Sequence, residues 1–374
     1  DHTGTNAAVS FGGPWGESET CIQCGQCALV CPTGALAVKD QTDRALDWFD
    51  DPAVTTVVQF APAVRVTIGE SIGARPGENL QGRIVAALRK LGADCVMDTR
   101  WSADVTIMEE GTELLERLRR QKEAGTLHGH PDTMFTSCCP GWINHIEKNR
   151  PDMIPHISST RSPQAIFGAL AKTWLPKTLG IPAERIRSIS IMPCTAKKME
   201  AARPEFIHDG RPDVDLVLTT REVIDMMQET GIQLGELELE SPDLPFGLGS
   251  GAAVIYGTSG GVAEAVVRHC LPDKSKNALR EISVLGLRGD APIKEASVTI
   301  GDTELKLAVV NGLANAKKLL KEIDEGKKFY HLIEVMTCQG GCVGGAGQPY
   351  GLKKRKEKRG DGLHLSDNAA MFKR

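Results

Sequence analysis

The feature that most constrains this chain is a glycine-rich stretch, residues 334–349, that carries two cysteines. It reads EVMTCQGGCVGGAGQP, with Gly340 and Gly341 between Cys338 and Cys342. Backbone with so few side chains can approach a bulky buried group closely and can adopt positive φ. With two sulfur ligands beside it, the stretch favours a buried soft-metal site.

Two other segments have the same form, a short apolar run that ends in cysteine. MFTSCCPGW, residues 134–142, contains the adjacent pair Cys138 and Cys139, and SISIMPCTAKKME, residues 188–200, contains Cys194. Three cysteine-bearing loops so far apart in the sequence indicate one cluster held at a seam of the fold.

A fourth group, CIQCGQCALVCPTGAL, has the cysteine spacing of bacterial ferredoxins. Cys21, Cys24, Cys27 and Cys31 are followed by Pro32, which predicts a [4Fe–4S] cluster. In two-cluster ferredoxins the fourth cysteine binds the other cluster, and no second set lies nearby. Either Cys31 completes the local cluster, or the natural chain extends upstream with a further set. The connector-like residues before the motif favour the upstream extension.

Composition limits the function classes. A chain of 374 residues can bury a large core and hold two or three domains. The net charge of −4 and the pI near 6.2 argue against nucleic acid or an anionic membrane surface as partner. No apolar run has the length of a bilayer span, and no signal peptide is visible. Eleven cysteines in tight groups indicate iron–sulfur ligands in a reducing cytoplasm.

From residue 51 onward the sequence alternates between strand and helix patterns, which predicts an α/β fold. We expect a ferredoxin-like segment over residues 1–50 and a larger domain over 51–374. The larger domain should have two lobes, 55–175 and 181–330, each a mainly parallel sheet flanked by helices, with 334–349 closing the site at their seam. Predicted strands include 57–60, 134–136, 186–192, 214–218, 281–287, 305–310 and 329–336. Predicted helices include 80–91 and 103–122, the latter with Val105, Met108, Leu115 and Leu118 facing inward.

Parallel sheets bind ligands outside the carboxyl ends of their strands. Ala61–Pro62, Cys138–Cys139, Cys194 and Cys338 each follow a predicted strand, so four loops should converge on one crevice. Successive side chains of extended backbone point to opposite sides. One cysteine of the adjacent pair can therefore ligate a cluster while the other remains a free thiol beside it.

In order and spacing, TSCCPGW, MPCTAKKME and EVMTCQGGCVGGAGQP resemble the three signatures of the [FeFe]-hydrogenase catalytic domain. The resemblance covers residues 55–374 and implies an enzyme that interconverts H2 with protons and electrons. It implies an H-cluster, a [4Fe–4S] cluster linked to a diiron subcluster with CO, cyanide and an azadithiolate bridge. The implied ligands of the [4Fe–4S] cluster are Cys139, Cys194, Cys338 and Cys342, with Cys342 bridging to the diiron subcluster.

The resemblance also implies partners: a ferredoxin, another redox subunit of a larger complex or a bifurcating acceptor, and the maturation proteins that build the diiron site. By the same likeness, Cys138 passes protons to the bridging amine. The implied relay continues through Glu113 and Ser158 to Glu110, with Arg117 at its outer end.

Other implied positions surround the diiron subcluster. Lys197 would donate to one cyanide, although a solvated surface lysine is the ordinary alternative. Backbone groups of Ala61, Pro62 and Ala63 would contact the other cyanide, and Met192 and Met336 would pack on the irons. Tyr256 and Ala346 depart from the phenylalanine and glycine common in the family.

Two other functions compete with catalytic hydrogen turnover. An H2-sensing hydrogenase would have the same chemistry at low turnover, and Cys138 with the two glutamates argues against it. A non-catalytic iron–sulfur assembly protein of the same fold would lack the diiron site. The intact TSCCPGW segment, with Lys197 and Met336, argues against that alternative.

Overall fold

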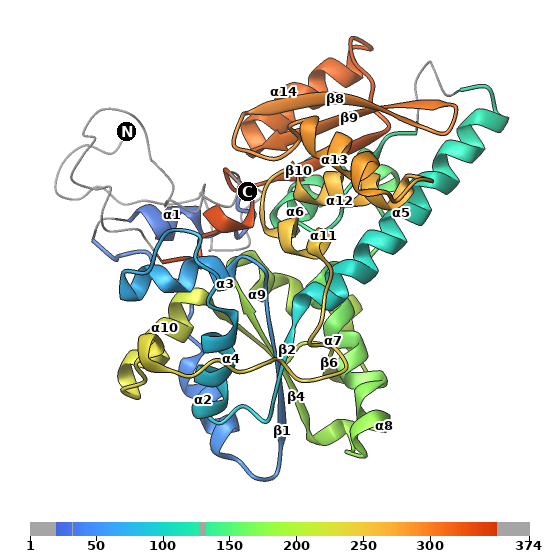
Figure 1. The fold of residues 1–374 in the computed structure, drawn as a ribbon. Coiled ribbons are helices and arrows are strands. Elements are labelled where there is room, and N and C mark those ends of the chain that lie inside the picture. The colour runs from blue at the N-terminus through green and yellow to red at the C-terminus, as the bar shows by residue number, and fades with distance from the viewer. Residues whose placement is uncertain (1–19, 32, 127–131, 350–374) are drawn as a thin grey trace, which may run out of the picture.

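The computed structural model describes residues 20–31, 33–126 and 132–349, which form two α/β lobes and a short N-terminal segment between them (Figure 1). The outer ends of the two predicted domains, residues 1–19 and 350–374, lie outside the described residues. The α/β class with parallel sheets flanked by helices is confirmed.

The lower lobe in Figure 1 is built on a four-stranded parallel sheet of order β2-β1-β4-β7. Val58 and Phe60 of β1 face a cluster that includes α4 and α10, whereas Val57 faces α7 and α8 on the other side. Burial of both faces explains why these strands read as continuous apolar runs. The strands are β1 (Thr55–Phe60), β2 (Cys95–Asp98), β4 (Ile186–Met192) and β7 (Leu216–Thr219), and the helices are α4 (Gln81–Lys90), α7 (Pro163–Thr173), α8 (Leu175–Leu179) and α10 (Thr220–Glu229).

The upper lobe has a second sheet of order β3-β10-β9-β8. Strand β10 is parallel to β3 and β9, and β8 and β9 form an antiparallel hairpin. Apolar side chains of α6 and α14 form a core with strands of this sheet, and those of α12 and α13 form another. The elements are β3 (Met134–Phe135), β8 (Ile293–Ile300), β9 (Thr303–Asn311), β10 (Leu332–Met336), α6 (Pro140–Asn149), α12 (Gly261–Cys270), α13 (Lys276–Val284) and α14 (Leu313–Asp324).

Shorter elements complete the described chain. They are α1 (Gln26–Val30), α2 (Thr42–Asp50), α3 (Val64–Thr67), α9 (Ala196–Ala201), α11 (Gly251–Val254), the β5 (Ile207–His208) and β6 (Arg211–Pro212) hairpin, and seven 3-10 turns including η7 (Cys342–Gly344). Within the described residues, no helix combines the length and the apolar character needed to cross a bilayer.

The longest helix, α5 (Thr99–Glu123), runs from the lower sheet to the upper lobe and packs against both α7 and α12 (Figure 1). Its predicted inward face is partly wrong, because Met108 is 56% exposed and Leu115 is 40% exposed. The buried face instead carries Ala103, Ile107 and Glu110. Our prediction selected large apolar residues, whereas this helix turns small and polar side chains toward the interior.

The predicted division of the larger domain at residue 181 does not match the sheets. Strands β4 and β7 follow that boundary yet pair in the sheet of β1, and β3 precedes it yet pairs with β10. Each sheet is therefore assembled from both halves of the sequence. Strand pairing is decided by hydrogen bonds between distant segments, which local patterns cannot identify.

One predicted strand is also wrong. Residues 281–287 fall at the end of α13, which begins after Ser275, whose hydroxyl accepts from the backbone N–H of Ala278. A short apolar run is compatible with either a strand or a helix. Here the N-cap Ser275 favours the helix. In contrast, the predicted capping box of Thr219 and Glu222 at the start of α10 is confirmed.

A buried ion pair joins the start of α5 to the loop after β1. The Asp98 carboxylate is fully buried, accepts from the backbone N–H of Arg100 at 2.9 Å and pairs with Arg65 at 2.8 Å. The Arg65 Nε in turn donates to the carbonyl of Pro62 at 3.2 Å. Asp98 therefore helps to hold the Ala61–Ala63 loop in place.

We expect Asp98→Ala to lower the free energy of unfolding by about 3–5 kcal/mol, because Arg65 would be left buried without its counter-ion. Chemical denaturation of the two proteins measures the difference. Glu116→Ala on the same helix is the matched control, since its ion pair with Arg119 is exposed and should contribute below about 1 kcal/mol. Equal losses in the two variants would contradict the assignment.

Candidate metal centre and active site

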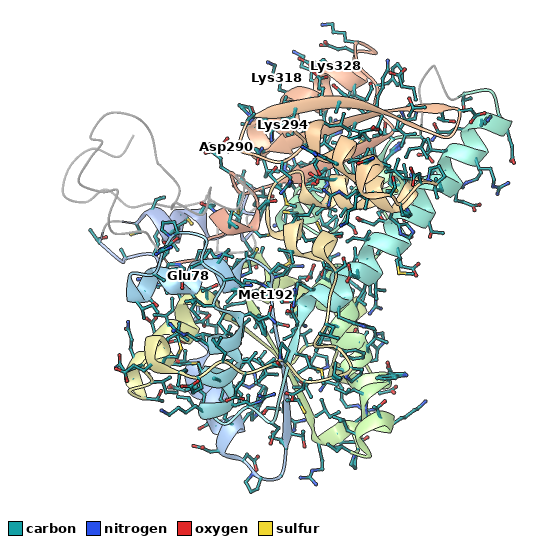
Figure 2. All side chains as sticks on the ribbon, viewed as in Figure 1. Glu78, Met192, Asp290, Lys294, Lys318 and Lys328 are labelled. Atoms are coloured by element: carbon teal, nitrogen blue, oxygen red, sulfur yellow. The ribbon has the colours of Figure 1, made fainter. Side chains whose placement is uncertain are left out.

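The cysteine loops meet where the carboxyl ends of the two sheets face each other. The Lys197 Nζ, on helix α9 after β4, donates to the carbonyl of Cys138 after β3 at 3.3 Å. The backbone N–H of Gly347, after β10, donates to the carbonyl of Pro193 after β4 at 2.9 Å. Figure 2 shows Met192 at the end of the lower sheet that faces the upper lobe. Loops from both sheets therefore form one site.

Four cysteines of these loops influence one another electrostatically: Cys139, Cys194, Cys338 and Cys342. Burial raises the pKa of Cys342 to about 12, and it raises the pKa values of Cys194 and Cys338 as well. The charge of Cys139 raises the pKa of each of these three thiols further. Thiolates buried together are stable only beside positive charge, which bound iron supplies.

The four thiols of Cys139, Cys194, Cys338 and Cys342 fit an iron–sulfur cubane, because a cubane requires four thiolates around a shielded space. Cys139 is the N-cap of α6 with extended backbone, and Pro140 follows it as the first helical residue. Cys342 opens η7. Among the described residues, no three His, Cys, Asp or Glu side chains are grouped so as to hold a single metal ion.

The glycines beside Cys338 and Cys342 are required by neighbouring backbone. Gly341 has φ of +92°, and a Cβ there would lie 2.4 Å from the backbone nitrogen of Ser259. A Cβ on Gly345 would lie 2.2 Å from the carbonyl oxygen of Pro193. The sequence suggested that these glycines admit a large buried group, and the structure adds loop-to-loop packing as a reason.

Cys138 lies beside these four thiols, and the charges of Cys139 and Cys342 act on it. Its side chain is buried in the upper-lobe core with Met336 and Tyr256. Burial raises the pKa of the Cys138 thiol well above its usual value, and the nearby charge of Glu110 acts in the same direction. Cys138 is therefore held as a neutral thiol near a buried carboxyl group.

Glu110 is the inner of the two carboxylates on α5. It is fully buried, and its Oε1 accepts from the backbone N–H of Ser137 at 3.1 Å and from the Ser137 hydroxyl at 3.2 Å. Its Oε2 has no hydrogen-bond partner among the described residues. Burial raises the pKa of Glu110 to about 7, so it can both bind and release a proton near neutral pH.

Glu113 lies farther out. Its Oε2 accepts from the hydroxyl of Ser158 at 2.9 Å and from the hydroxyl of Ser159 at 3.1 Å, and its Oε1 accepts from Arg117 at 2.8 Å. Arg117 also pairs with Asp132 at 3.1 Å. A hollow of about 400 Å³ opens at this point, and Arg117, Ser158 and Ser159 are part of its lining.

The structure does not follow the predicted order of the relay. The path predicted from the sequence ran from Cys138 through Glu113 and Ser158 to Glu110. In the structure Glu110 binds Ser137, the residue before Cys138, whereas Glu113 lies with Ser158 and Arg117 beside the outer hollow. Residues three apart share a helix face, so spacing alone did not say which carboxylate is deeper.

Lys197 is buried, contrary to the ordinary fate of a lysine. Its Nζ pairs with Glu200 at 2.7 Å, and Glu200 also accepts from Ser162 at 2.9 Å and from Gln164 at 3.0 Å. Burial alone would lower the pKa of Lys197, but the Glu200 carboxylate outweighs burial and the net pKa is raised. The ammonium group therefore remains charged beside the Cys138 loop. Glu200 was not predicted from the sequence as a site residue, although it lies three residues after Lys197 on one helix face.

A second missed carboxylate is Glu334, the charged residue within the last apolar strand. It is fully buried and accepts from the backbone N–H groups of Gly260 at 2.6 Å and Ala263 at 2.7 Å. Burial raises the pKa of Glu334 to about 7. The hydroxyl of Tyr256 is buried too and has no partner among the described residues.

The remaining predicted contacts lie at strand ends. Met192 and Met336 are the last residues of β4 and β10 and are buried. The backbone N–H of Ala61 donates to the carbonyl of Ile191 at 3.0 Å. Ala63 packs against Gly257, where an added Cβ would lie 3.2 Å from that of Ala63. Met336 shares a core cluster with Cys138, and Ala63 belongs to a small cluster that packs against Cys342.

The ferredoxin-like segment contacts the site directly. Burial raises the pKa of Cys24, and the charge of Cys139 adds to the effect. Lys148 on α6 donates to the carbonyl of Cys21 at 3.0 Å. The hydroxyl of Thr33 lowers the pKa of Cys31 to about 7. Cys24 therefore faces the four-cysteine site.

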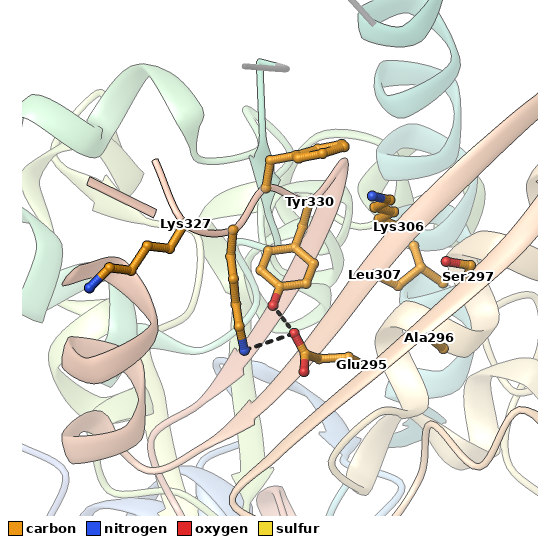
Figure 3. Close-up of a pocket in the computed structure, with 9 residues that line it drawn as sticks. Glu295, Ala296, Ser297, Lys306, Leu307, Lys327 and Tyr330 are labelled. Carbon is orange, nitrogen blue, oxygen red and sulfur yellow. Dashed lines mark hydrogen bonds and ion pairs between the residues drawn. The ribbon is translucent and has the colours of Figure 1, made fainter. Parts of the chain in front are cut away.

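A hollow of about 420 Å³ lies elsewhere, on the β8–β9 face (Figure 3). Its Glu295 accepts from the hydroxyl of Tyr330 and pairs with Lys328 at 3.1 Å. None of the predicted site residues lines it. Its charged groups are already paired, so it is not the candidate active site.

The fold and the site together define an iron–sulfur protein. Four cysteines form its centre, and the buried Cys138 thiol and the buried Glu110 carboxyl group lie beside them. A family model described as "Iron only hydrogenase large subunit, C-terminal domain" matches residues 54–346, and a 4Fe-4S binding domain model matches residues 17–37. The chain belongs to the iron-only, or [FeFe]-, hydrogenase family.

Individual relatives agree with this family. The chain is 45% identical over 343 residues to an NADP-reducing hydrogenase subunit of Solidesulfovibrio fructosivorans, covering 90% of this chain and 58% of the relative. It is 41% identical over 328 residues to iron hydrogenase 1 of Clostridium pasteurianum, covering 87% and 56%. The chain thus spans less than two thirds of either relative.

Among solved structures, an apo [FeFe]-hydrogenase of Chlamydomonas reinhardtii matches with a TM-score of 0.70 and 36% identity. The match covers 88% of this chain and 87% of that one. A relative with another printed role is the cytosolic iron–sulfur assembly component 3 of Mus musculus, 30% identical over 343 residues, covering 88% of this chain and 70% of the relative.

We expect the carboxyl groups of Glu110 and Glu334 to titrate near pH 7, because burial raises the pKa of both to about that value. Infrared difference spectra across this range should show the C=O band of protonated carboxylic acids, and Glu110→Gln should remove part of it. The folded pKa exceeds the unfolded value of about 4.3, so each group disfavours folding increasingly as pH rises from about 4.3 to 7.

Glu116→Gln is the control for this titration, because its carboxylate is exposed on the same helix. The band should keep its full amplitude near pH 7 in that variant. A band that is complete and unchanged in Glu110→Gln would contradict the assignment of Glu110 as a buried, neutral-range acid.

Proposed function

We propose that this chain is the catalytic unit of an [FeFe]-hydrogenase that interconverts H2 with protons and electrons. The observation that carries the proposal is the line from the buried Cys138 thiol through Glu110 and Glu113 to the surface hollow, beside the four-cysteine site. A proton path that begins at a metal site and ends at the surface serves a reaction that makes or consumes protons.

The residues that would hold the H-cluster are the four cysteines of the site. Cys139, Cys194, Cys338 and Cys342 would ligate its [4Fe–4S] part, and Cys342 would also bridge to the diiron subcluster. When bound, that subcluster with its CO, cyanide and azadithiolate ligands supplies the redox chemistry of H2. Cys21, Cys24 and Cys27, with Cys31, would hold the accessory cluster.

The chain's own groups would move the proton. The Cys138 thiol would hold it at the inner end, and Glu110 would receive it at the unpaired Oε2. The Ser158 hydroxyl, which donates to Glu113 at 2.9 Å, would bridge toward the outer carboxylate. Arg117, which pairs with Glu113 at 2.8 Å and lines the hollow, would hold that carboxylate in place at the outer end.

Positive charge and backbone groups would orient the inorganic ligands. Lys197 is held charged by Glu200 and is aimed toward the Cys138 loop, so it would donate to a cyanide. The Ala61–Ala63 backbone, fixed by Arg65, would contact the other cyanide. Met192 and Met336 would shield the irons from water.

We infer the route of electron supply from the position of the first cysteine set, Cys21, Cys24, Cys27 and Cys31. Cys24 faces the four-cysteine site, so electrons would enter through the accessory cluster from a ferredoxin or a redox partner subunit, in the cytoplasm. The similarity to a subunit of an NADP-reducing hydrogenase supports a larger complex. Maturation proteins would be needed to supply the diiron site.

Iron–sulfur assembly is a second candidate, favoured by the similarity to the mouse assembly component. A protein of that kind would need no proton path from a buried thiol. A hydrogen sensor would need the site but no fast relay. The presence of Cys138, Glu110, Glu113 and Arg117 between the cysteine site and the hollow supports turnover over both alternatives.

Infrared spectroscopy tests the proposal. After coexpression with diiron maturation proteins, we expect bands of metal-bound CO and cyanide in the purified full chain, together with H2 turnover. A cubane-loaded chain that shows no such bands after maturation would favour the assembly function. Bands accompanied by only residual turnover would favour sensing.

We expect Cys138→Ala to retain all iron and lower H2 turnover by at least about 10²-fold, because the relay loses its innermost acid while the four ligands remain. Iron analysis and an H2 assay on the matured protein measure both quantities. Cys270→Ala is the matched control, since it removes another buried thiol outside the site. Turnover near the parent rate in Cys138→Ala would exclude the proposed relay.

A further inference from the structure

One side chain of the N-terminal segment reaches the four-cysteine site. Gln26, the first residue of α1, donates through Nε2 to the sulfur of Cys338 at 3.1 Å and to the carbonyl of Gly344 at 2.9 Å. In the sequence it lies between Cys24 and Cys27. A single amide therefore connects the turn of the first cysteine set to a cysteine of the second.

The backbone around Gln26 fixes this contact. Gly25 has φ of +68°, and a Cβ there would lie 2.3 Å from the hydroxyl oxygen of Thr195. That hydroxyl donates to the carbonyl of Gln23 at 3.3 Å. The turn is thus packed against the residue that follows Cys194. Because the backbone just before Gln26 is held in this way, its amide loses little freedom when it binds the sulfur.

An N–H group directed at a cluster-bound sulfur has a definite electrostatic effect. Reduction adds negative charge that spreads onto the thiolate ligands, and a hydrogen bond to such a sulfur stabilises the reduced form. The Gln26 donor is partly shielded from water, which strengthens the effect.

We propose that Gln26 is a positioning residue that raises the reduction potential of the iron–sulfur cluster bound at Cys338, and so favours electron delivery from the first cysteine set. This inference rests on the proposed function, because it requires a cluster at Cys338. It assigns to the ferredoxin-like segment a direct influence on the catalytic cluster in addition to holding a cluster of its own.

The test is an EPR-monitored redox titration of the full chain reconstituted with iron and sulfide, without the diiron subcluster. Gln26→Leu keeps the side-chain size and removes both donors. We expect the cubane at Cys338 to titrate at a more negative potential in this variant, with the same iron content. Cys24→Ser, which disrupts the first set, assigns the two cubane signals.

Gln26→Asn and Gln23→Asn form a matched pair, since each shortens one glutamine of the same turn by a methylene. The shortened side chain in Gln26→Asn cannot make both contacts, so we expect the negative shift in that variant and none in Gln23→Asn. This pair decides the question even if Gln26→Leu loses iron. Unchanged potentials in the Gln26 variants would overturn this inference alone. Absence of a second cubane in the unsubstituted chain would overturn the proposed function as well.

Discussion

Backbone packing between loops of the two sheets holds the cysteine site together. The N–H of Gly347 binds the carbonyl of Pro193, and the N–H of Ser259 binds the carbonyl of Gly340 at 3.0 Å. Gly341 approaches Ser259 so closely that no side chain fits. The loops that carry Cys194, Cys338 and Cys342 are fixed relative to one another by these contacts, which bring the three thiols to one site.

The packing of these loops also buries charged groups. Polar groups taken out of water need partners, and most of those near the site have them: Lys197 has Glu200, Glu334 has the start of α12, and Asp98 has Arg65. Glu110 is an exception, as is Tyr256, because one oxygen of each is unpaired among the described residues. An incompletely satisfied carboxyl group with a raised pKa is suited to proton transfer rather than to stability.

Helix α5 connects the packed loops with the buried charged groups. It starts at the ion pair that holds the Ala61–Ala63 loop and passes between α7 and α12. It carries Glu110 inside and Glu113 with Arg117 at the hollow. A shift of this helix would therefore disturb the Ala61–Ala63 loop and the two glutamates together. Gln26 makes a comparable connection, since it links the two cysteine sets.

Short-range patterns in the sequence predict iron–sulfur chemistry and the kinds of elements. Cysteine spacing, Pro140 after Cys139, and the capping residues of α10 act within a few residues of each other, so they can be read locally. The sequence did not determine that β4 pairs with β1, that Glu110 is deeper than Glu113, or that Glu200, Glu334 and Gln26 reach the site. Those facts depend on hydrogen bonds and burial between segments far apart in the chain, and only the tertiary structure decides them.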